Sequence, residues 1–84
     1  MDSGIKELLK NSNKVMGLRQ VLRGVRKGQI GSVLLALDAD ENIKLQVQNL
    51  CNVNNMLMFT CESKEELGKE LQIDRACAVV GFLK

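Results

Sequence analysis

The 84-residue chain contains no histidine, tryptophan, tyrosine or proline, and its only aromatic side chains are Phe59 and Phe82. Without histidine, an acyl-transfer site would need a lysine or carboxylate base beside its nucleophile, and no recognisable nucleophile motif is present. We therefore expect a protein that is not an enzyme. Because 45% of its residues are hydrophobic, the chain is predicted to fold as one domain over residues 1–84, with an aliphatic core.

Cysteine is also scarce. The three cysteines are separated by ten and sixteen residues, which is not the paired spacing of zinc ligands. Their odd number and apolar neighbours predict buried thiols rather than disulfides. The stretch DADEN (38–42) begins like a calcium loop, but Ile43 stands where that loop has glycine and Asn49 where it has glutamate. We expect no metal and no cofactor.

Long hydrophobic runs are missing too. No run approaches the roughly 20 apolar residues of a membrane-spanning helix. The first twelve residues, MDSGIKELLKNS, are too polar for an export signal. These observations predict a cytoplasmic protein with no membrane partner.

What the sequence does contain is an asymmetry of charge. Residues 1–37 hold seven Lys/Arg and two Asp/Glu, a net charge of +5, whereas residues 38–84 hold five and eight, a net charge of −3. The basic half is densest in GLRQVLRGVRKGQ (17–29), which has four cationic side chains, three glycines and no acid. Such a cluster is either an ordinary solvated surface or a surface for a polyanion. Charge alone leaves both interpretations open.

The apolar residues of this basic stretch fall at helical spacing. They predict a helix that Gly17 opens and Gly28 stops, with one apolar stripe. The stripe follows the i, i+3, i+4, i+7 pattern and consists of Leu18, Val21, Leu22 and Val25. The cationic side chains lie on the other side of the helix: Arg19, Arg23, Arg26 and Lys27.

Helical patterns alternate with apolar runs of strand length along the rest of the chain. Helices are predicted over 3–10, 40–55 and 63–71, and a capping box of Ser63 and Glu66 opens the last one. Strands are predicted over 14–17, 32–37, 56–61 and 76–83, and the runs 32–37 and 56–61 are typical of strands buried on both faces. This order predicts an α/β fold, a three-layer α/β/α sandwich with a mixed, mostly four-stranded central sheet.

Two segments, GLRQVLRGVRKGQIGSVLLALDAD (17–40) and SKEELGKELQIDRACAVV (63–80), resemble the kink-turn RNA-binding proteins related to ribosomal proteins L7Ae and L30e. The short bacterial members are the most similar, and the resemblance spans about residues 5–83. It implies a protein that binds structured RNA, ribosomal or riboswitch-like, and not DNA. The small size and few aromatic residues of the chain are compatible with a monomer. A kink-turn is a sharply bent duplex in which tandem sheared G·A pairs lie beside a bulge.

The resemblance implies that the second helix enters the RNA groove at the G·A pairs. Arg19 and Gln20 stand where archaeal and eukaryotic members carry Asn and Glu, and Arg23 stands where they carry Lys. Arg19 would donate to guanine O6 or N7, and the amide oxygen of Gln20 would accept a guanine N–H. Gly17 would let the backbone approach the RNA. The cations expected to meet phosphates are Arg23, Arg26 and Lys27.

The second segment implies a further part of the site. Lys64 matches a lysine that the family uses near the RNA, although it could be a plain surface residue. The loop 73–76 matches one that packs against the flipped-out bulge nucleotide, with Ile73 giving apolar contact, unless it belongs to the core, and Arg75 a stack or phosphate contact. Asp74 is polar for such a surface. Gln72 replaces a common glycine, which leaves the loop conformation and nucleotide preference open.

Two other kinds of function are weighed beside RNA binding. A protein-interaction module on the same fold would use the acidic C-terminal half or the 72–76 loop, and it would not distinguish kinked from straight RNA. A small-ligand or enzyme accessory domain has no motif to support it.

Overall fold

The computed structural model describes residues 3–11 and 13–84. Every predicted helix and strand is present, with bounds that differ by a few residues from those expected. In chain order the elements are α1 (Ser3–Asn11), β1 (Lys14–Met16), α2 (Leu18–Arg26), β2 (Ile30–Ala36), α3 (Glu41–Asn54), β3 (Leu57–Cys61), α4 (Lys64–Glu70) and β4 (Val79–Leu83).

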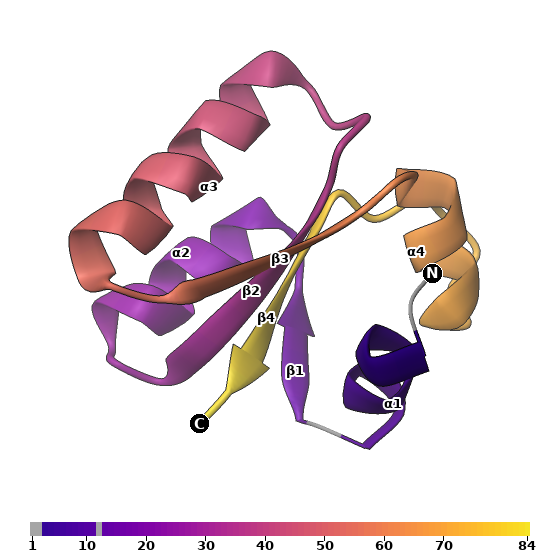
Figure 1. Cartoon of the computed structure of the whole chain (residues 1–84), viewed down its shortest axis with the longest axis horizontal. Coiled ribbons are helices and arrows are strands. Elements are labelled where there is room, and N and C mark those ends of the chain that lie inside the picture. Colours follow the sequence, from indigo (N-terminus) through magenta and orange to yellow (C-terminus); the bar gives the residue numbers. More distant parts are fainter. Residues whose placement is uncertain (1–2, 12) are drawn as a thin grey trace.

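The four strands form one mixed sheet in the order β1-β4-β2-β3. Strand β4 is antiparallel to both of its neighbours, and β2 is parallel to β3. The C-terminal ends of β1, β2 and β3 therefore meet at one end of the sheet, which we call the upper end (Figure 1). Helices α2, α3 and α4 all begin at this upper end.

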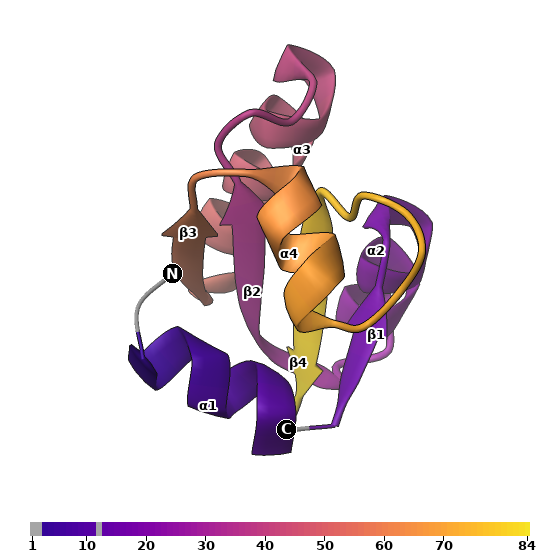
Figure 2. The ribbon, with the colours of Figure 1, turned by 90° about the vertical axis from the view of Figure 1, so that its right-hand side faces the viewer.

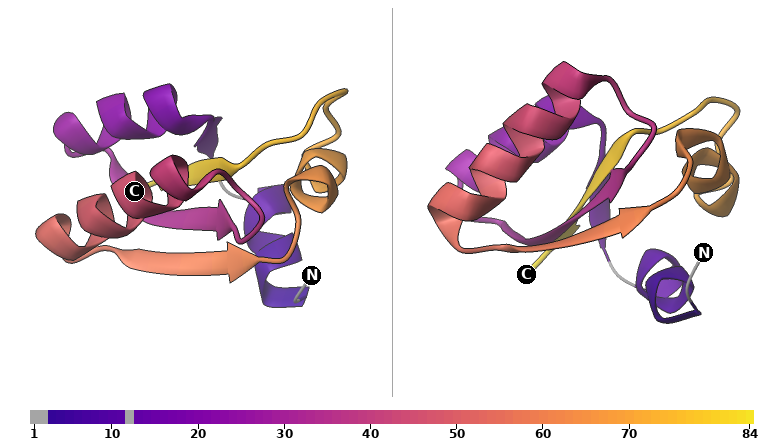
Figure 3. Two further views of the ribbon diagram at one scale, coloured as in Figure 1. Left: turned by 90° about the horizontal axis from the view of Figure 1, so that it is seen from above. Right: turned by 45° about the horizontal axis from the view of Figure 1, so that its top comes forward.

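Helices cover both faces of the sheet. Figures 2 and 3 show α2 and α3 on one face and α1 and α4 on the other. A hydrophobic core lies on each face of the sheet, and alternate side chains of the central strand β2 point into one or the other. Val33 and Leu35 pack under α2 and α3, and Leu34 and Ala36 pack under α1 and α4. All four are completely buried, which explains the continuous apolar run. The predicted α/β/α sandwich is confirmed.

The prediction that residues 56–61 form a strand buried on both faces is wrong. Strand β3 is an edge strand paired with β2, and its Leu57 is 68% exposed. Leu37, the last residue of the run 32–37, lies beyond β2 and is 50% exposed. An apolar run does not distinguish a central strand from an edge strand, because the sheet order depends on distant segments. The last strand begins at Val79 rather than at residue 76.

All three cysteines are free and buried, as predicted: Cys51, Cys61 and Cys77. Burial raises the pKa of each thiol above its ordinary value, so the reactive thiolate is disfavoured. Within residues 3–11 and 13–84, no group of three or more histidine, cysteine or acidic side chains is placed to hold a metal ion. None of the helices described is both long enough and apolar enough to cross a membrane.

Candidate nucleic-acid interface

Helix α2 begins in a backbone conformation that essentially only glycine adopts. Gly17 is its N-cap, with φ 95° and ψ 151°. The Gly17 N–H donates to the carbonyl oxygen of Val79 at 2.9 Å, and the Gly17 carbonyl accepts from Val21 N–H at 3.0 Å. These bonds fix the start of α2 against the first residue of β4. Among the described residues no side chain caps α2, so its first N–H groups remain available to an external acceptor.

Two further glycines shape α2. A Cβ atom at Gly24 would lie 2.7 Å from Cγ1 of Ile30, so this glycine lets the helix pack closely against β2. Gly28 follows the C-cap residue Lys27 with φ 70°, and its N–H donates to the Val25 carbonyl at 3.0 Å. This left-handed glycine ends the helix as predicted, at Arg26. Lys27 lies just beyond the helix rather than in it.

The predicted contact residues of α2 all reach the surface: Arg19, Gln20, Arg23, Arg26 and Lys27 are exposed. Within the described part of the chain none of these cations forms an ion pair. The apolar stripe faces the sheet and is anchored by Val21, which is completely buried. The helix therefore presents an uncompensated basic face to solvent.

The loop after α4 begins with a residue in the left-handed region. Gln72 has φ 60°, and its N–H donates to the Lys69 carbonyl at 3.0 Å. The next N–H, of Ile73, donates to the Gly68 carbonyl at 3.1 Å. These two bonds form a Schellman motif, whose left-handed position usually holds glycine. Gln72 thus adopts the conformation that a glycine would have there.

Ile73 lies partly in the core and partly at the surface. It is half-buried and packs against the core cluster that contains Leu67, the apolar contact expected in a Schellman motif. The carbonyl group of Arg75 comes so close to Gly68 that no Cβ atom would fit between them. The loop is therefore held against α4, while Asp74 and Arg75 stay exposed. An open hollow here is lined by Glu65, Lys69, Ile73, Asp74, Arg75 and Ala76.

Lys64 opens α4 and connects three loops through its backbone. Its N–H donates to Oδ1 of Asp38 at 2.8 Å, and its carbonyl accepts from Cys77 N–H at 3.0 Å. The preceding Ser63 supplies its half of the predicted capping box, because its Oγ accepts from the N–H groups of Glu65 and Glu66 at 3.1 and 3.2 Å. The side chain of Lys64 is exposed.

The two predicted segments come together at the upper end of the sheet. The bond from Gly17 to Val79 places the start of α2 beside the end of the α4–β4 loop, and the bond from Cys77 to Lys64 joins that loop to α4. Figure 2 shows this loop passing from α4 across to the side of β1 and α2. Arg26 and Lys27 lie farther off, about 13 Å along the nine-residue helix.

The electrostatics of the three helix starts differ. The first turn of α2 contains no acid, whereas α3 begins with Glu41 and α4 contains Glu65 and Glu66 in its first turn. The start of α2 is consequently the most electropositive of the three, whereas acidic side chains flank Lys64 at the start of α4. Sequence reasoning missed this local acidity, which could have been found in the motif SKEEL itself.

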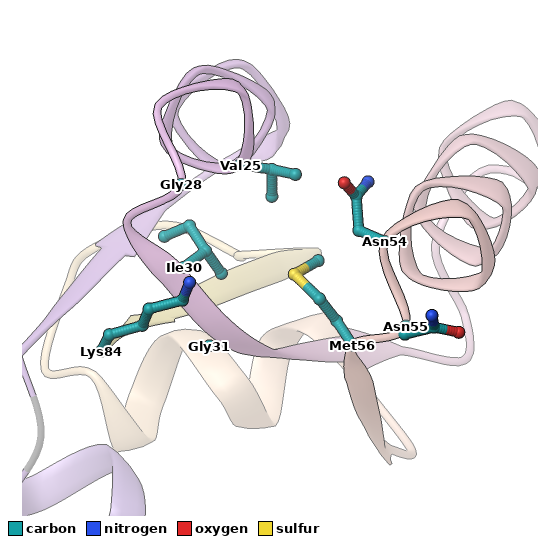
Figure 4. A pocket seen from close by; sticks show the side chains of 8 residues that line it. All are labelled: Val25, Gly28, Ile30, Gly31, Asn54, Asn55, Met56 and Lys84. Atoms are coloured by element: carbon teal, nitrogen blue, oxygen red, sulfur yellow. The ribbon is translucent and has the colours of Figure 1, made fainter.

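A further pocket lies at the opposite, lower end of the sheet (Figure 4). It contains one cation, Lys84, and none of the predicted site residues. The lining residues are Val25, Gly28, Ile30, Gly31, Asn54, Asn55, Met56 and Lys84.

These features define a three-layer α/β/α protein that carries an exposed basic helix at one side of a mixed sheet. The chain belongs to the ribosomal protein L7Ae/L30e/S12e/Gadd45 family, whose model matches residues 1–84. Relatives from Staphylococcus aureus strains JH9 and N315, each named an RNA-binding protein, are 29% identical over 82 residues. The alignment covers 94% of this chain and 98% of each relative. The resemblance inferred from the sequence is confirmed.

Solved structures agree with this fold. A Bacillus halodurans protein of unknown function superposes with a TM-score of 0.83 and 20% identity, covering 95% of this chain and 80% of the other. The 15.5kD RNA binding protein of Giardia lamblia superposes with a TM-score of 0.81 and 23% identity, covering 95% of this chain and 68% of the other. At these identities the superpositions establish the fold.

Proposed function

We propose that this protein is a non-enzymatic, monomeric RNA-binding protein that recognises and stabilises kink-turn RNA through the N-terminus of α2 and the 72–76 loop. Membership of the family and the RNA-binding names of the Staphylococcus relatives support RNA as the ligand. The observation that supports this site most directly is the 2.9 Å bond from Gly17 N–H to the Val79 carbonyl, which joins the acid-free start of α2 to the first residue of β4, shortly after that loop.

The first turn of α2 reads the G·A pairs in this proposal. Arg19 and Gln20 are exposed side by side at the helix start, without a described partner in the chain. The Arg19 guanidinium donates to guanine O6 or N7, and the Gln20 amide oxygen accepts a guanine N–H. A neutral glutamine forms a weaker bond than the glutamate of other family members, but it does not repel the phosphates nearby.

The remaining cations of α2 bind the backbone. Arg23, Arg26 and Lys27 are exposed along the second half of α2 and just beyond its end. Cations spaced along a helix can contact successive phosphates on one strand of a bent duplex. Such contacts position the protein without reading sequence. Binding therefore weakens as salt increases, because each neutralised phosphate releases counterions.

The 72–76 loop contacts the flipped-out nucleotide of the bulge. Ile73 anchors the loop in the core, and the close packing on Gly68 leaves the loop little freedom. The exposed Arg75 guanidinium stacks on the extruded base or binds its phosphate. A preformed loop of this kind binds the kinked RNA better than the open RNA, and so shifts the RNA population toward the kink.

Two substitutions in α2 test the proposed site. Gln20→Ala removes the acceptor for guanine and is expected to weaken binding to a kink-turn RNA about tenfold, while Arg19→Glu nearly abolishes it. The matched controls are Gln48→Ala on α3 and Lys10→Glu on α1, both at exposed positions away from the site. Titrations at fixed salt measure the four affinities. Wild-type affinity in both α2 variants would refute the site.

A protein partner is the second candidate function. It is favoured by an uncharged stretch, residues 45–61, in which Leu45, Val53 and Leu57 are 55%, 81% and 68% exposed. Low charge with exposed apolar side chains is the composition of interface cores. This stretch lies within the C-terminal half expected at first but contains none of its acidic side chains. It becomes the main candidate if the protein binds kinked and straight RNA equally.

A further inference from the structure

We infer that Asp38 is a positioning residue for the RNA interface, because its carboxylate accepts the backbone N–H of Lys64 across 26 residues of sequence at 2.8 Å. Asp38 follows β2 and Lys64 opens α4, so the bond ties together two loops at the upper end of the sheet. The inference rests on the proposed function and adds Lys64, at the same end of the sheet, to its RNA contacts.

The hydrogen bonds around Lys64 show why an outside acceptor is needed. Ser63 Oγ already takes the N–H groups of Glu65 and Glu66, and it leaves the first N–H of α4 to another partner. Asp38 supplies that partner, while Cys77 N–H holds the carbonyl of the same residue at 3.0 Å. Both backbone groups of Lys64 are thereby fixed, which limits where its exposed side chain can reach.

Charge separates positioning from simple attraction. Asp38 adds a negative charge beside helix starts that already carry Glu41, Glu65 and Glu66. A carboxylate here repels an incoming phosphate backbone, so its charge opposes RNA binding. Its oxygen atom, in contrast, favours binding by holding Lys64. A neutral acceptor at the same place would keep the hydrogen bond that holds Lys64 and remove the repulsion of the phosphates.

Three variants separate these effects. Asp38→Ala removes both acceptor and charge, and we expect it to weaken binding to a kink-turn RNA about fivefold, the loss of one oriented cation. Asp38→Asn keeps an amide oxygen as acceptor and is expected to bind as tightly as wild type or more tightly. Glu62→Ala is the matched control, because it removes an exposed carboxylate from the same region without touching the Lys64 N–H.

A double-substitution cycle distinguishes positioning from general destabilisation. In a Lys64→Ala background, Asp38→Ala should no longer weaken RNA binding, because the side chain that Asp38 orients is gone; the loss of its negative charge leaves the affinity equal or slightly higher. An equal loss in both backgrounds, or wild-type affinity for Asp38→Ala alone, would overturn the inference. Thermal unfolding confirms that each variant is folded at the temperature of the titration.

Amide hydrogen exchange tests the same bond without RNA. The Lys64 N–H is expected to exchange faster in Asp38→Ala than in wild type, and to stay protected in Asp38→Asn. Unchanged exchange in Asp38→Ala contradicts the inference. If the wild-type protein binds no kink-turn RNA, the proposed function fails and this inference falls with it. If the wild type binds and only the Asp38 variants behave otherwise than expected, the inference alone fails.

Discussion

Replacing Gln72 by glycine should stabilise the protein. Gln72 occupies the left-handed position of the Schellman motif that ends α4, with φ 60°. A residue with a Cβ atom is strained there by about 1–2 kcal/mol, a penalty that glycine does not have. Glycine increases the entropy of the unfolded chain, which offsets about 0.5–1 kcal/mol of the gain. The net expectation is a stabilisation of about 0.5–1 kcal/mol.

Thermal unfolding of Gln72→Gly measures this effect directly. For a domain of this size the expected gain corresponds to a rise in Tm of about 2–8 °C. The chain also allows the reverse substitution as a control. Gly28 occupies the equivalent position after α2 with φ 70°, and no atom lies within 4 Å of an added Cβ. Gly28→Gln should lower Tm by a similar amount. A decrease in Tm for Gln72→Gly would refute the reasoning, since it would mean that the Gln72 side chain stabilises the loop.

Three further predictions follow from the site and the core. Gly17→Ala should destabilise the protein by about 1–2 kcal/mol in urea unfolding through backbone strain alone, because nothing lies within 4 Å of the added Cβ; an unchanged midpoint would contradict this. Lys27→Ala should make the plot of log binding constant against log salt concentration shallower by about 0.7–0.9 in slope. An unchanged slope would show that Lys27 contacts no phosphate. Burial raises the pKa of the three thiols in the folded protein above the ordinary value of 9.0. Their contribution to stability is therefore complete below pH 9.0 and is lost as the pH rises through the folded-state pKa. Urea midpoints that stay constant above pH 9.0 would contradict this expectation.

Local patterns predicted most of the fold. The spacing of the apolar stripe on α2, the Ser63 cap of α4 and the buried run that became β2 are each readable within a few residues, and each is confirmed. The order of the strands in the sheet depends on contacts between distant segments. For this reason the edge position of β3, and with it the exposure of Leu57, could not be predicted.

The residues of the candidate site were proposed from the sequence, but the hydrogen bonds that connect them were not. The structure brings the start of α2 and the 72–76 loop to the upper end of the sheet. The bond between Asp38 and Lys64 spans 26 positions, and no local pattern indicates it. The left-handed conformation of Gln72 was equally hidden, since glutamine rarely adopts it. A core position for Ile73 was one of two alternatives that the sequence left open.

Kink-turn recognition is tested most directly by a titration at fixed salt with two RNAs, one an intact kink-turn and one in which Watson–Crick pairs replace the tandem G·A pairs. The wild-type protein is expected to bind the intact kink-turn much more tightly. Equal affinity for the two RNAs would contradict kink-turn recognition, because it would leave only nonspecific attraction between the basic face of α2 and any RNA.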